Sequence, residues 1–390
     1  MTNPRVSGVG LTHFGEYPER TGRDMFAEAG LAALDDAGVQ PDDIEALFYG
    51  NFMGEMAEHQ GHEAPMMAEA IGARNIEATR YESACASAGA AVRQGVKTVR
   101  NGEADVVVVG GAERMTNIGT EGATEALSIA ADELYEVRQG MTFPGAYALM
   151  ARAYFEEYGG SREDLAHVAV KNHDNALPNE YAQLRTELTV EDALDAFVVA
   201  DPLGLYDACP ITDGAAAVVL TSEDYAAEND LDSTVAITGT GQGGDSLALQ
   251  DREFLARTPA AEHAAEEAYD DAGVTADDAD FAEVHDCFTI AEVLATEALG
   301  FFETGEGITA AREGRSTRDG EMPVNLSGGL KAKGHPVGAT GASQIVEVTR
   351  LLRGDHPRSD AVADADTAVA HNAGGTVAST TVHVVEEVGN

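Results

Sequence analysis

The sequence predicts an α/β protein built from two similar halves, because two segments of the chain recur at a similar spacing. Leu34–Phe52, LDDAGVQPDDIEALFYGNF, matches Tyr269–Phe288, YDDAGVTADDADFAEVHDCF. In each copy a helix ends at a glycine and is followed by an acidic loop and a strand. A weaker match relates Arg100–Glu113 to Asp364–Thr376, each an apolar strand that ends in small residues. With 42 glycines and 44% hydrophobic residues, we expect layered sheets covered by helices.

The repeat also predicts how the chain is divided. The first half is expected at residues 1–114 and 207–230, and the second half at residues 235–390. Residues 115–206 have no counterpart in the second half, so they are predicted to be an insertion that covers a substrate site. The polar segment Ser222–Thr234, SEDYAAENDLDST, is the expected link between the halves.

The charge balance is strongly acidic, with 68 Asp and Glu residues against 24 Lys and Arg residues and a formal net charge of −44. The acidic residues are spread along the chain, so they repel nucleic-acid phosphates and argue against a nucleic-acid-binding protein. Only four of the basic residues are lysines. This balance predicts adaptation to a high-salt cytoplasm, where screening weakens self-repulsion, rather than an ordinary acidic protein.

The sequence predicts neither secretion nor membrane insertion. Its first residues, MTNPRVSGVGLTHFGEYPER, lack the apolar stretch of a secretory signal. The run VVVV at Val106–Val109 is too short to span a membrane and predicts a buried parallel strand. Three widely spaced cysteines, Cys85, Cys209 and Cys287, fit a reducing compartment. We therefore expect a cytoplasmic protein.

Cys85 is the first candidate for chemistry. It lies in YESACASAGAAVRQGVKTVRNG, where a strand-like stretch enters a turn of small residues and an amphipathic helix follows. At a helix N-terminus, the helix dipole and the free N–H groups lower the pKa of a thiol and favour the nucleophilic thiolate. A lone cysteine in an apolar segment is more often a core residue. Here the small neighbours leave space around the sulfur, which favours a nucleophile.

His335 is the second candidate. It lies in LKAKGHPVGATGASQIVEVTRLL, where Pro336 stiffens the chain and glycines on both sides let backbone and substrate approach closely before a helix starts. A histidine in so small-residue a loop has little hydrophobic surface to pack against. We therefore expect a catalytic rather than a structural role.

Two further histidines are expected at strand ends of the second half. His371 begins HNAGGTVASTTVHVV, where glycines after a buried strand can aim N–H groups at an oxyanion. His285 and Cys287 lie in FAEVHDCFTIAEVLATEALG, where a strand passes into a helix and Asp286 is a candidate helix cap. A Cys85 thiolate with two or three such histidines predicts acyl transfer through an activated thiol.

The remaining motifs predict no metal and no nucleotide cofactor. Cys209, in YDACPITDGAAAVVL, precedes a proline and a turn and is expected to be structural. Only His285 and Cys287 lie near each other in the sequence, and they are too close together to form a zinc site without further ligands. The glycine run Gly239–Gly244, GTGQGG, has no dinucleotide-binding context.

Five motifs in the same order resemble those of the thiolase superfamily. ESACASAG resembles its nucleophile motif, VHDCFTIAE the motif of the sterol-carrier-protein-type thiolases, and NLSGGLKAKGHPVGATG the GHP motif. KNHDNALPNEYAQL and DPLGLYDACPITDGAAAVVL resemble further segments of that branch, so the resemblance covers nearly the whole chain. It implies a duplicated five-layer α-β-α-β-α fold, which agrees with the repeat.

The resemblance also implies roles for individual residues. Cys85 would take the acyl group from an acyl-CoA. His335 would activate that thiol and, with His285, stabilise the enolate oxygen of the second substrate. The backbone N–H groups of Cys85 and Ala373 would form the oxyanion hole.

The chain departs from the best-known thiolases at one position. Those enzymes begin the last glycine loop with a second cysteine, which moves the α-proton, whereas this chain has His371 there. The resulting Cys/His/His set resembles that of archaeal thiolases and ketoacyl synthases. His371 and Cys287 are both candidates for the proton-transfer base. The imidazole pKa lies nearer neutrality, which favours His371.

Coenzyme A (CoA) is a polyanion, and few basic residues are available to bind it. The candidate CoA-binding residues are the basic Lys331 and Lys333, together with Ser246. Archaeal thiolases of this branch commonly act with a small OB-fold, zinc-ribbon partner of the DUF35 type that helps to bind CoA, and the acidic balance is consistent with such a partner. We also expect a homodimer or a dimer of dimers.

The sequence therefore predicts an acetyl-CoA C-acyltransferase, a β-ketothiolase, from a halophilic archaeon. It would join short acyl-CoAs into acetoacetyl-CoA or 3-ketovaleryl-CoA, or catalyse the reverse thiolysis, through an acyl-Cys85 intermediate. CoA thioesters would be substrates, and no cofactor is expected. The alternatives are a ketoacyl synthase-like condensing enzyme with a carrier-protein substrate and a non-catalytic acyl-CoA-binding subunit.

Overall fold

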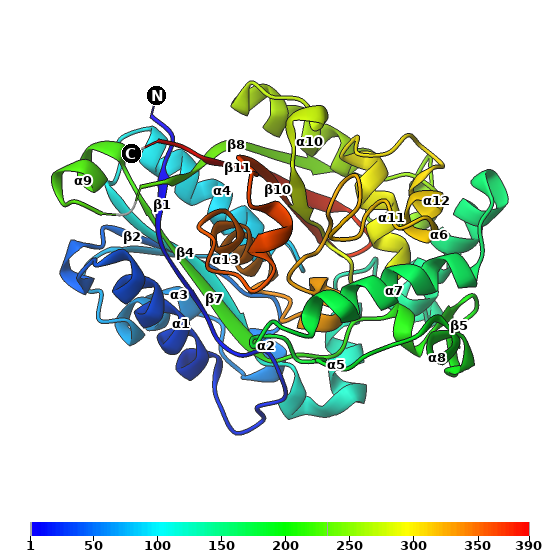
Figure 1. Ribbon diagram of the computed structural model, residues 1–390. Coiled ribbons are helices and arrows are strands. Elements are labelled where there is room, and N and C mark those ends of the chain that lie inside the picture. Colours follow the sequence, from blue (N-terminus) through cyan, green and yellow to red (C-terminus); the bar gives the residue numbers. More distant parts are fainter. Residues whose placement is uncertain (1, 232, 390) are drawn as a thin grey trace.

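Nine strands of the computed structural model form one mixed sheet that folds around two central helices (Figure 1), and two short strands pair separately. The structure describes residues 2–231 and 233–389. The first half of the sheet runs in the order β3 (Glu77–Tyr81), β2 (Ala46–Gly50), β4 (Val106–Glu113), β7 (Gly214–Thr221) and β1 (Arg5–Leu11). The second half continues with β8 (Val235–Gly244), β11 (Ser379–Glu387), β10 (Thr367–Gly374) and β9 (Phe281–Glu283). Strands β1 and β8 join the halves through one residue pair, Arg5 with Ala236.

The two halves repeat one pattern, as the sequence predicts. In the first half β2 is parallel to β4, which is antiparallel to β7, which is antiparallel to β1. In the second half β9, β10, β11 and β8 repeat these directions in the same order. Helices α1 (Gly22–Ala37) and α10 (Pro259–Ala272) precede β2 and β9, and each ends at a left-handed glycine, Gly38 or Gly273. The prediction of a duplicated fold is therefore confirmed.

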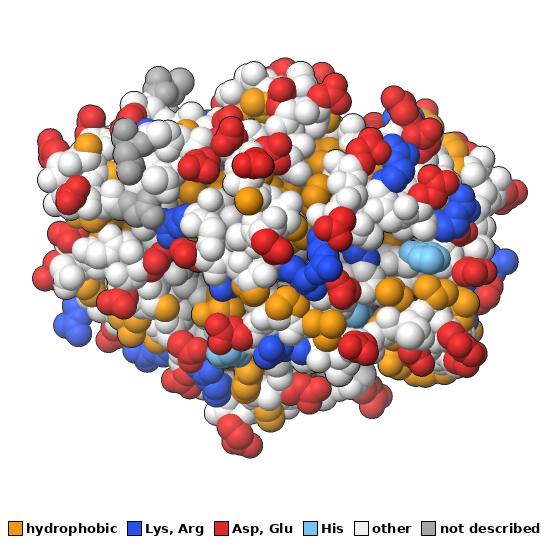
Figure 2. All heavy atoms as spheres, viewed as in Figure 1, with side chains coloured by type: hydrophobic (Ala, Val, Ile, Leu, Met, Phe, Trp, Pro, Cys, Tyr) orange, Lys and Arg blue, Asp and Glu red, His pale blue; other side chains and the backbone are white. Residues whose placement is uncertain are grey.

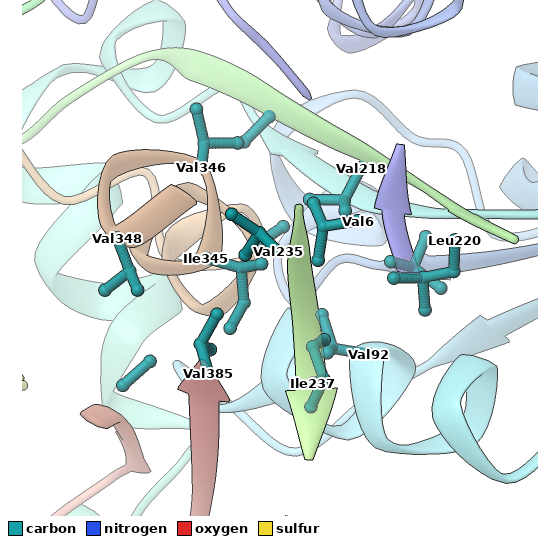
Figure 3. Close-up of a cluster of buried hydrophobic side chains, with 14 of the residues drawn as sticks. Val6, Val92, Val218, Leu220, Val235, Ile237, Ile345, Val346, Val348 and Val385 are labelled. Carbon is teal, nitrogen blue, oxygen red and sulfur yellow. The ribbon is translucent and has the colours of Figure 1, made fainter. Parts of the chain in front are cut away.

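Helices α4 (Ser87–Arg100) and α13 (Thr340–Leu352) form the central layer between the two halves of the sheet. Figure 3 shows their interface with the strands, where Val92 of α4 and Ile345 of α13 lie among buried valines and isoleucines. Helices α1 and α3 (Glu63–Ala70) cover the outer face of the first half, and α10 covers that of the second. The predicted five layers are thus present. Strand β4 is fully buried and parallel to β2, but antiparallel to β7, so it is parallel on one side only.

Residues 115–206 carry most of the remaining secondary structure. Their elements are α5 (Gly119–Ser128), α6 (Phe143–Tyr158), α7 (Arg162–Ala176), α8 (Val190–Asp195), β5 (Val198–Ala200) and β6 (Leu203–Gly204). Helix α7 packs against the π-helical turn η7 (Gly329–Lys333), and α6 packs against α11 (Thr289–Ala298). Elsewhere lie the shorter helices α2 (Gly54–Ala57), α9 (Glu223–Glu228) and α12 (Gly307–Arg312). The division into domains stays a prediction. Asp232 of the predicted link lies outside the described residues, as do Met1 and Asn390 at the ends of the predicted halves.

The surface has the acidic character expected from the composition. On the face shown in Figure 2, Asp and Glu side chains are spread over the molecule and outnumber Lys and Arg side chains. Across residues 2–231 and 233–389, none of the helices combines the length and the apolar character needed to cross a membrane.

Candidate active site

The loops that enter the two central helices bring residues from both halves together. Cys85 lies between β3 and α4, and His335 lies between η7 and α13. His285 follows β9 in the second half. One ligand atom from each of these three residues lies within 4.8 Å of the other two. The His285 and His335 rings are nearly perpendicular, with centroids 5.0 Å apart. These three residues, which the sequence predicts to act together, thus meet at one site.

The turn around Cys85 has an unusual backbone conformation. Ala84 has a φ of 49°, which non-glycine residues rarely adopt. Its N–H donates to Glu82 Oε1 at 2.7 Å, and this bond offsets part of the strain. The turn places Cys85 two residues before the first residue of α4, close to the helix start that the sequence predicts.

The hydrogen bonds of His335 fix where its proton lies. Thr340 Oγ1 donates its single proton to the Pro336 carbonyl at 3.0 Å, so it accepts from His335 Nδ1 at 2.7 Å. The proton of the neutral ring is therefore on Nδ1. His335 Nε2 is buried without a hydrogen-bond partner. Its free lone pair can accept a proton from the thiol.

His285 has the opposite tautomer. Asn372 Nδ2 lies 3.0 Å from the Cys85 carbonyl oxygen, which can only accept, and 3.1 Å from His285 Nδ1. An amide nitrogen only donates, so His285 Nδ1 accepts and the ring proton is on Nε2. His285 Nε2 is also buried and unpartnered. It therefore offers an N–H to an oxyanion.

The two candidate bases differ in their surroundings. The His285 backbone N–H donates to His371 Nδ1 at 3.3 Å, so neutral His371 carries its proton on Nε2. His371 lies within β10 rather than at its end, because the strand continues to Gly374. Cys287 is buried and hydrogen-bonded to the Tyr147 hydroxyl, which donates to the Gly375 carbonyl at 3.0 Å.

Burial keeps the site uncharged. It raises the pKa of Cys85 to about 12, against a smaller lowering by the Gly375 N–H. Burial also lowers the pKa of His335 to about 3 and that of His371 to about 4. The pKa of His285 lies well below its usual value, first through burial and then through the two neighbouring histidines. The expectation of a lowered Cys85 pKa is therefore wrong, because burial outweighs the helix N-terminus.

Comparison with known proteins places this site in a family. Residues 7–224 match the model described as "Thiolase, N-terminal domain", and residues 241–387 match "Thiolase C-terminal domain-like". The chain belongs to the thiolase family. It is 44% identical over 384 residues to an acetyl-CoA acetyltransferase of Methanothermobacter thermautotrophicus, which covers 98% of this chain and 99% of the relative. Identity to the acetyl-CoA acetyltransferase of Methanocaldococcus jannaschii is 39%, over 99% of this chain and 100% of the relative.

Solved structures agree with this assignment. A structure described as "Ltp2-ChsH2(DUF35) aldolase" is similar with a TM-score of 0.83 and 26% identity, covering 99% of this thiolase and 98% of that chain. A monomeric SCP2-thiolase-like protein from Mycobacterium smegmatis shares the fold, with a TM-score of 0.76 at 20% identity over 100% of this chain and 78% of that chain. The two acetyl-CoA acetyltransferase relatives and the family model show that the thiolase is an acyltransferase. Neither alternative, a ketoacyl synthase-like enzyme or a non-catalytic subunit, is favoured.

An open cleft of about 570 Å³ lies beside Cys85 of this thiolase. Ala84, Gly374 and Gly375 line it next to Cys85, and Leu247 lies at its edge. A Cβ on Gly374 would lie 2.3 Å from the Ser83 carbonyl oxygen, so only glycine allows β10 this close to the nucleophile loop. The N–H that hydrogen-bonds to the Cys85 sulfur belongs to Gly375, and the Cys85 N–H also lowers the pKa of the thiol. The predicted oxyanion role of Ala373, which lies in β10, stays a prediction.

The structure corrects the predicted role of the two lysines. Lys331 and Lys333 are each only 2% exposed. Lys333 Nζ lies 3.5 Å from Glu347 Oε1, and Lys331 Nζ lies 3.5 Å from His173 Nε2. Both ammonium groups therefore have internal neighbours and do not reach CoA phosphates at the surface. Ser246 is exposed next to two residues that line the cleft, and its CoA-binding role stays a prediction.

Other sequence-predicted residues hold the loops of the site. Asp286 accepts backbone N–H groups of Leu330 and Lys331 in η7, so it anchors this turn instead of capping α11. The Cys209 N–H donates to the Cys287 carbonyl at 3.0 Å, which agrees with a structural role. Thr340 and Asn372 were not predicted as site residues, although they lie in the same motifs as His335 and His371, GHPVGATG and HNAGG.

The neutral state of Cys85 is testable by alkylation. Because the pKa of Cys85 is about 12, the thiolate fraction grows about tenfold per pH unit throughout the neutral range. We expect alkylation of Cys85 by iodoacetamide, followed by peptide mass spectrometry, to keep accelerating from pH 6 to pH 9. A plateau near pH 7 would indicate a resting thiolate–imidazolium pair and contradict the assignment.

Proposed function

We propose that this thiolase is an acetyl-CoA C-acyltransferase that joins short acyl-CoAs into acetoacetyl-CoA or 3-ketovaleryl-CoA, or catalyses the reverse thiolysis. The observation that carries the proposal is the pairing of a thiol with two differently protonated imidazoles. His335 presents a lone pair and His285 presents an N–H beside Cys85. Attack of a thiol on a thioester needs both groups, because the thiol has to give up its proton and the thioester carbonyl oxygen gains negative charge.

In the first half-reaction, Cys85 Sγ attacks the thioester carbonyl while its proton moves to His335 Nε2. The tetrahedral oxyanion forms near backbone N–H groups, for which Cys85, Gly375 and Ala373 are the candidates. When the intermediate collapses, the bond to the CoA sulfur breaks. His335 returns the proton to the departing CoA thiolate, which leaves an acyl-Cys85 thioester and a neutral imidazole.

In the second half-reaction, the base, for which we propose Cys287, first passes its thiol proton to His335 Nε2 and then takes the α-proton of an acyl-CoA. The resulting enolate attacks the carbonyl of acyl-Cys85, the bond to Cys85 Sγ breaks, and the released thiolate takes the proton back from His335. The His285 Nε2–H and, once protonated, His335 stabilise the enolate oxygen. We propose Cys287 rather than His371 as the proton acceptor, contrary to the preference from the sequence. Burial raises the pKa of Cys287 well above its usual value, so its thiol has to lose its own proton before it can take the α-proton. The His371 Nδ1 lone pair already accepts a backbone N–H, and its Nε2 carries the proton.

The biological setting belongs to the same proposal. The charge of −44 supports a halophilic organism. The identity to two methanogen enzymes supports an archaeal one. The sterol-carrier-protein branch is supported by 30% identity to human Sterol carrier protein 2, over 95% of this chain and 69% of that protein. We infer a cytoplasmic enzyme of lipid metabolism that acts as a homodimer or a dimer of dimers.

The acyl-enzyme test decides the proposed chemistry. Mixing the protein with acetyl-CoA in high salt and measuring its intact mass is expected to show one acetyl group. Peptide mapping is expected to place that group on Cys85. The Cys85→Ala variant lacks the sulfur and is expected to show neither the adduct nor acetoacetyl-CoA formation. A folded wild-type protein without the adduct would defeat the proposal.

The proton-transfer base can be identified by deuterium exchange. In D₂O the acetyl methyl of acetyl-CoA exchanges only if a base removes the α-proton. We expect Cys287→Ala to slow this exchange about 100-fold or more, since general-base catalysis contributes about 10²–10⁴-fold. His371→Asn is expected to slow it much less. The reverse order would restore His371 as the base.

A DUF35-type partner is proposed because both lysines near the site are buried and the structural relative is a complex with such a protein. We expect the isolated chain to bind acetyl-CoA weakly, with a KM at least about tenfold above that of the complex, because a polyanion gains from added cationic groups. Steady-state kinetics with and without the partner measure this ratio. Equal KM values would show that CoA binding needs no partner.

A further inference from the structure

We propose that Asn372 is a positioning residue that fixes the tautomer of His285 and thereby keeps the Cys85, His285 and His335 cluster a catalytic site rather than a metal site. Only the expected effect on acetylation and condensation rates rests on the proposed function. Asn372 lies in β10 and is 1% exposed. Its amide connects the nucleophile loop of one half to His285 of the other.

The orientation of the Asn372 amide is determined by its neighbours. Nδ2 has two protons and two acceptors, the Cys85 carbonyl oxygen at 3.0 Å and His285 Nδ1 at 3.1 Å. If the amide were flipped, Oδ1 would face the Cys85 carbonyl oxygen with no proton between them. The carbonyl thus selects the amide orientation, and the amide in turn selects the imidazole tautomer.

The packing around Asn372 leaves its side chain little freedom. A Cβ on Gly341 would lie 2.4 Å from Asn372 Oδ1, and one on Gly89 would lie 2.9 Å from it. These two glycines belong to the central helices α13 and α4, and they form a slot for the amide. The side chain is therefore held by shape as well as by its hydrogen bonds.

The fixed tautomer separates two kinds of chemistry. A thiolate and two imidazole nitrogens are typical zinc ligands, and here the three atoms lie within 4.8 Å of one another. A metal at His285 Nε2 would need the ring proton on Nδ1, where it would meet the Asn372 N–H protons. Asn372 therefore disfavours a metal at His285 Nε2, the atom whose N–H is available to the enolate oxygen.

The test replaces the amide by a carboxylate of the same shape. In the Asn372→Asp variant the carboxylate accepts, so the His285 proton is expected to move to Nδ1. The ¹⁵N chemical shifts of the His285 ring report the tautomer directly. Gln344→Glu is the matched control, because Gln344 Nε2 donates to the buried His371 carbonyl at 2.8 Å and its side chain is hydrogen-bonded to no histidine ring. An unchanged tautomer in Asn372→Asp, or a changed one in Gln344→Glu, would overturn the proposal.

Two further readouts separate positioning from misfolding. Asn372→Asp also loses the hydrogen bond to the Cys85 carbonyl, so acetylation of Cys85 is expected to fall, but at least about tenfold less than condensation, which falls about 100-fold, as for loss of one oxyanion donor. Zn²⁺ is expected to protect Cys85 of this variant from alkylation at a concentration at least about tenfold lower than in wild type. Equal losses in both half-reactions, or equal Zn²⁺ protection, would contradict the inference. A wild type that forms no acetyl adduct would defeat the proposed function alone, because the tautomer and Zn²⁺ readouts need no turnover.

Discussion

The close approach of the two central helices is the constraint on which the site depends. A Cβ on Gly341 of α13 would lie 2.3 Å from the backbone nitrogen of Gly89 in α4, so the helices touch backbone to backbone. Each helix follows a loop that carries a catalytic candidate, Cys85 before α4 and His335 before α13. Since these loops come from different halves of the repeat, the distance between thiol and imidazole depends on this crossing. A larger residue at either glycine would move the two groups apart.

The second constraint is electrostatic. A resting thiolate would be half-buried and would lie near Glu113, whose charge raises the pKa of Cys85 after the larger effect of desolvation. A neutral thiol beside a neutral imidazole avoids that cost. Charge then forms only as the substrate reacts, where His335 takes the proton and N–H groups face the oxyanion. The chemistry therefore relies on fixed proton positions, which explains why Thr340 and Asn372 are as important as the rings they contact.

The fold could be predicted from the sequence because its signals are local. Helix-ending glycines, acidic loops and apolar strands recur in both halves. Cys85 and His335 are marked by their small-residue surroundings, and His285 by its place where a strand passes into a helix. The proton positions could not be predicted. Asn372 acts on Cys85 and His285 through contacts 287 and 87 residues apart in the chain. The prediction of a lowered Cys85 pKa was wrong for a related reason, since burial depends on residues packed from other segments.

The buried lysines show how composition and structure constrain each other in an acidic protein. Of the four lysines, Lys171, Lys331 and Lys333 are buried and only Lys97 is exposed. Burial alone would raise the pKa of Glu347, yet Lys333 and the nearby His356 and Arg350 lower it to about 2. Removing Lys333 would leave Arg350, 3.1 Å away, as the remaining cation paired with this buried carboxylate, and would raise the pKa of Glu347. The cations at the surface are therefore mostly arginine, whereas three of the four lysines lie in the interior. Lys331 and Lys333 therefore precede His335 because they anchor its loop from within.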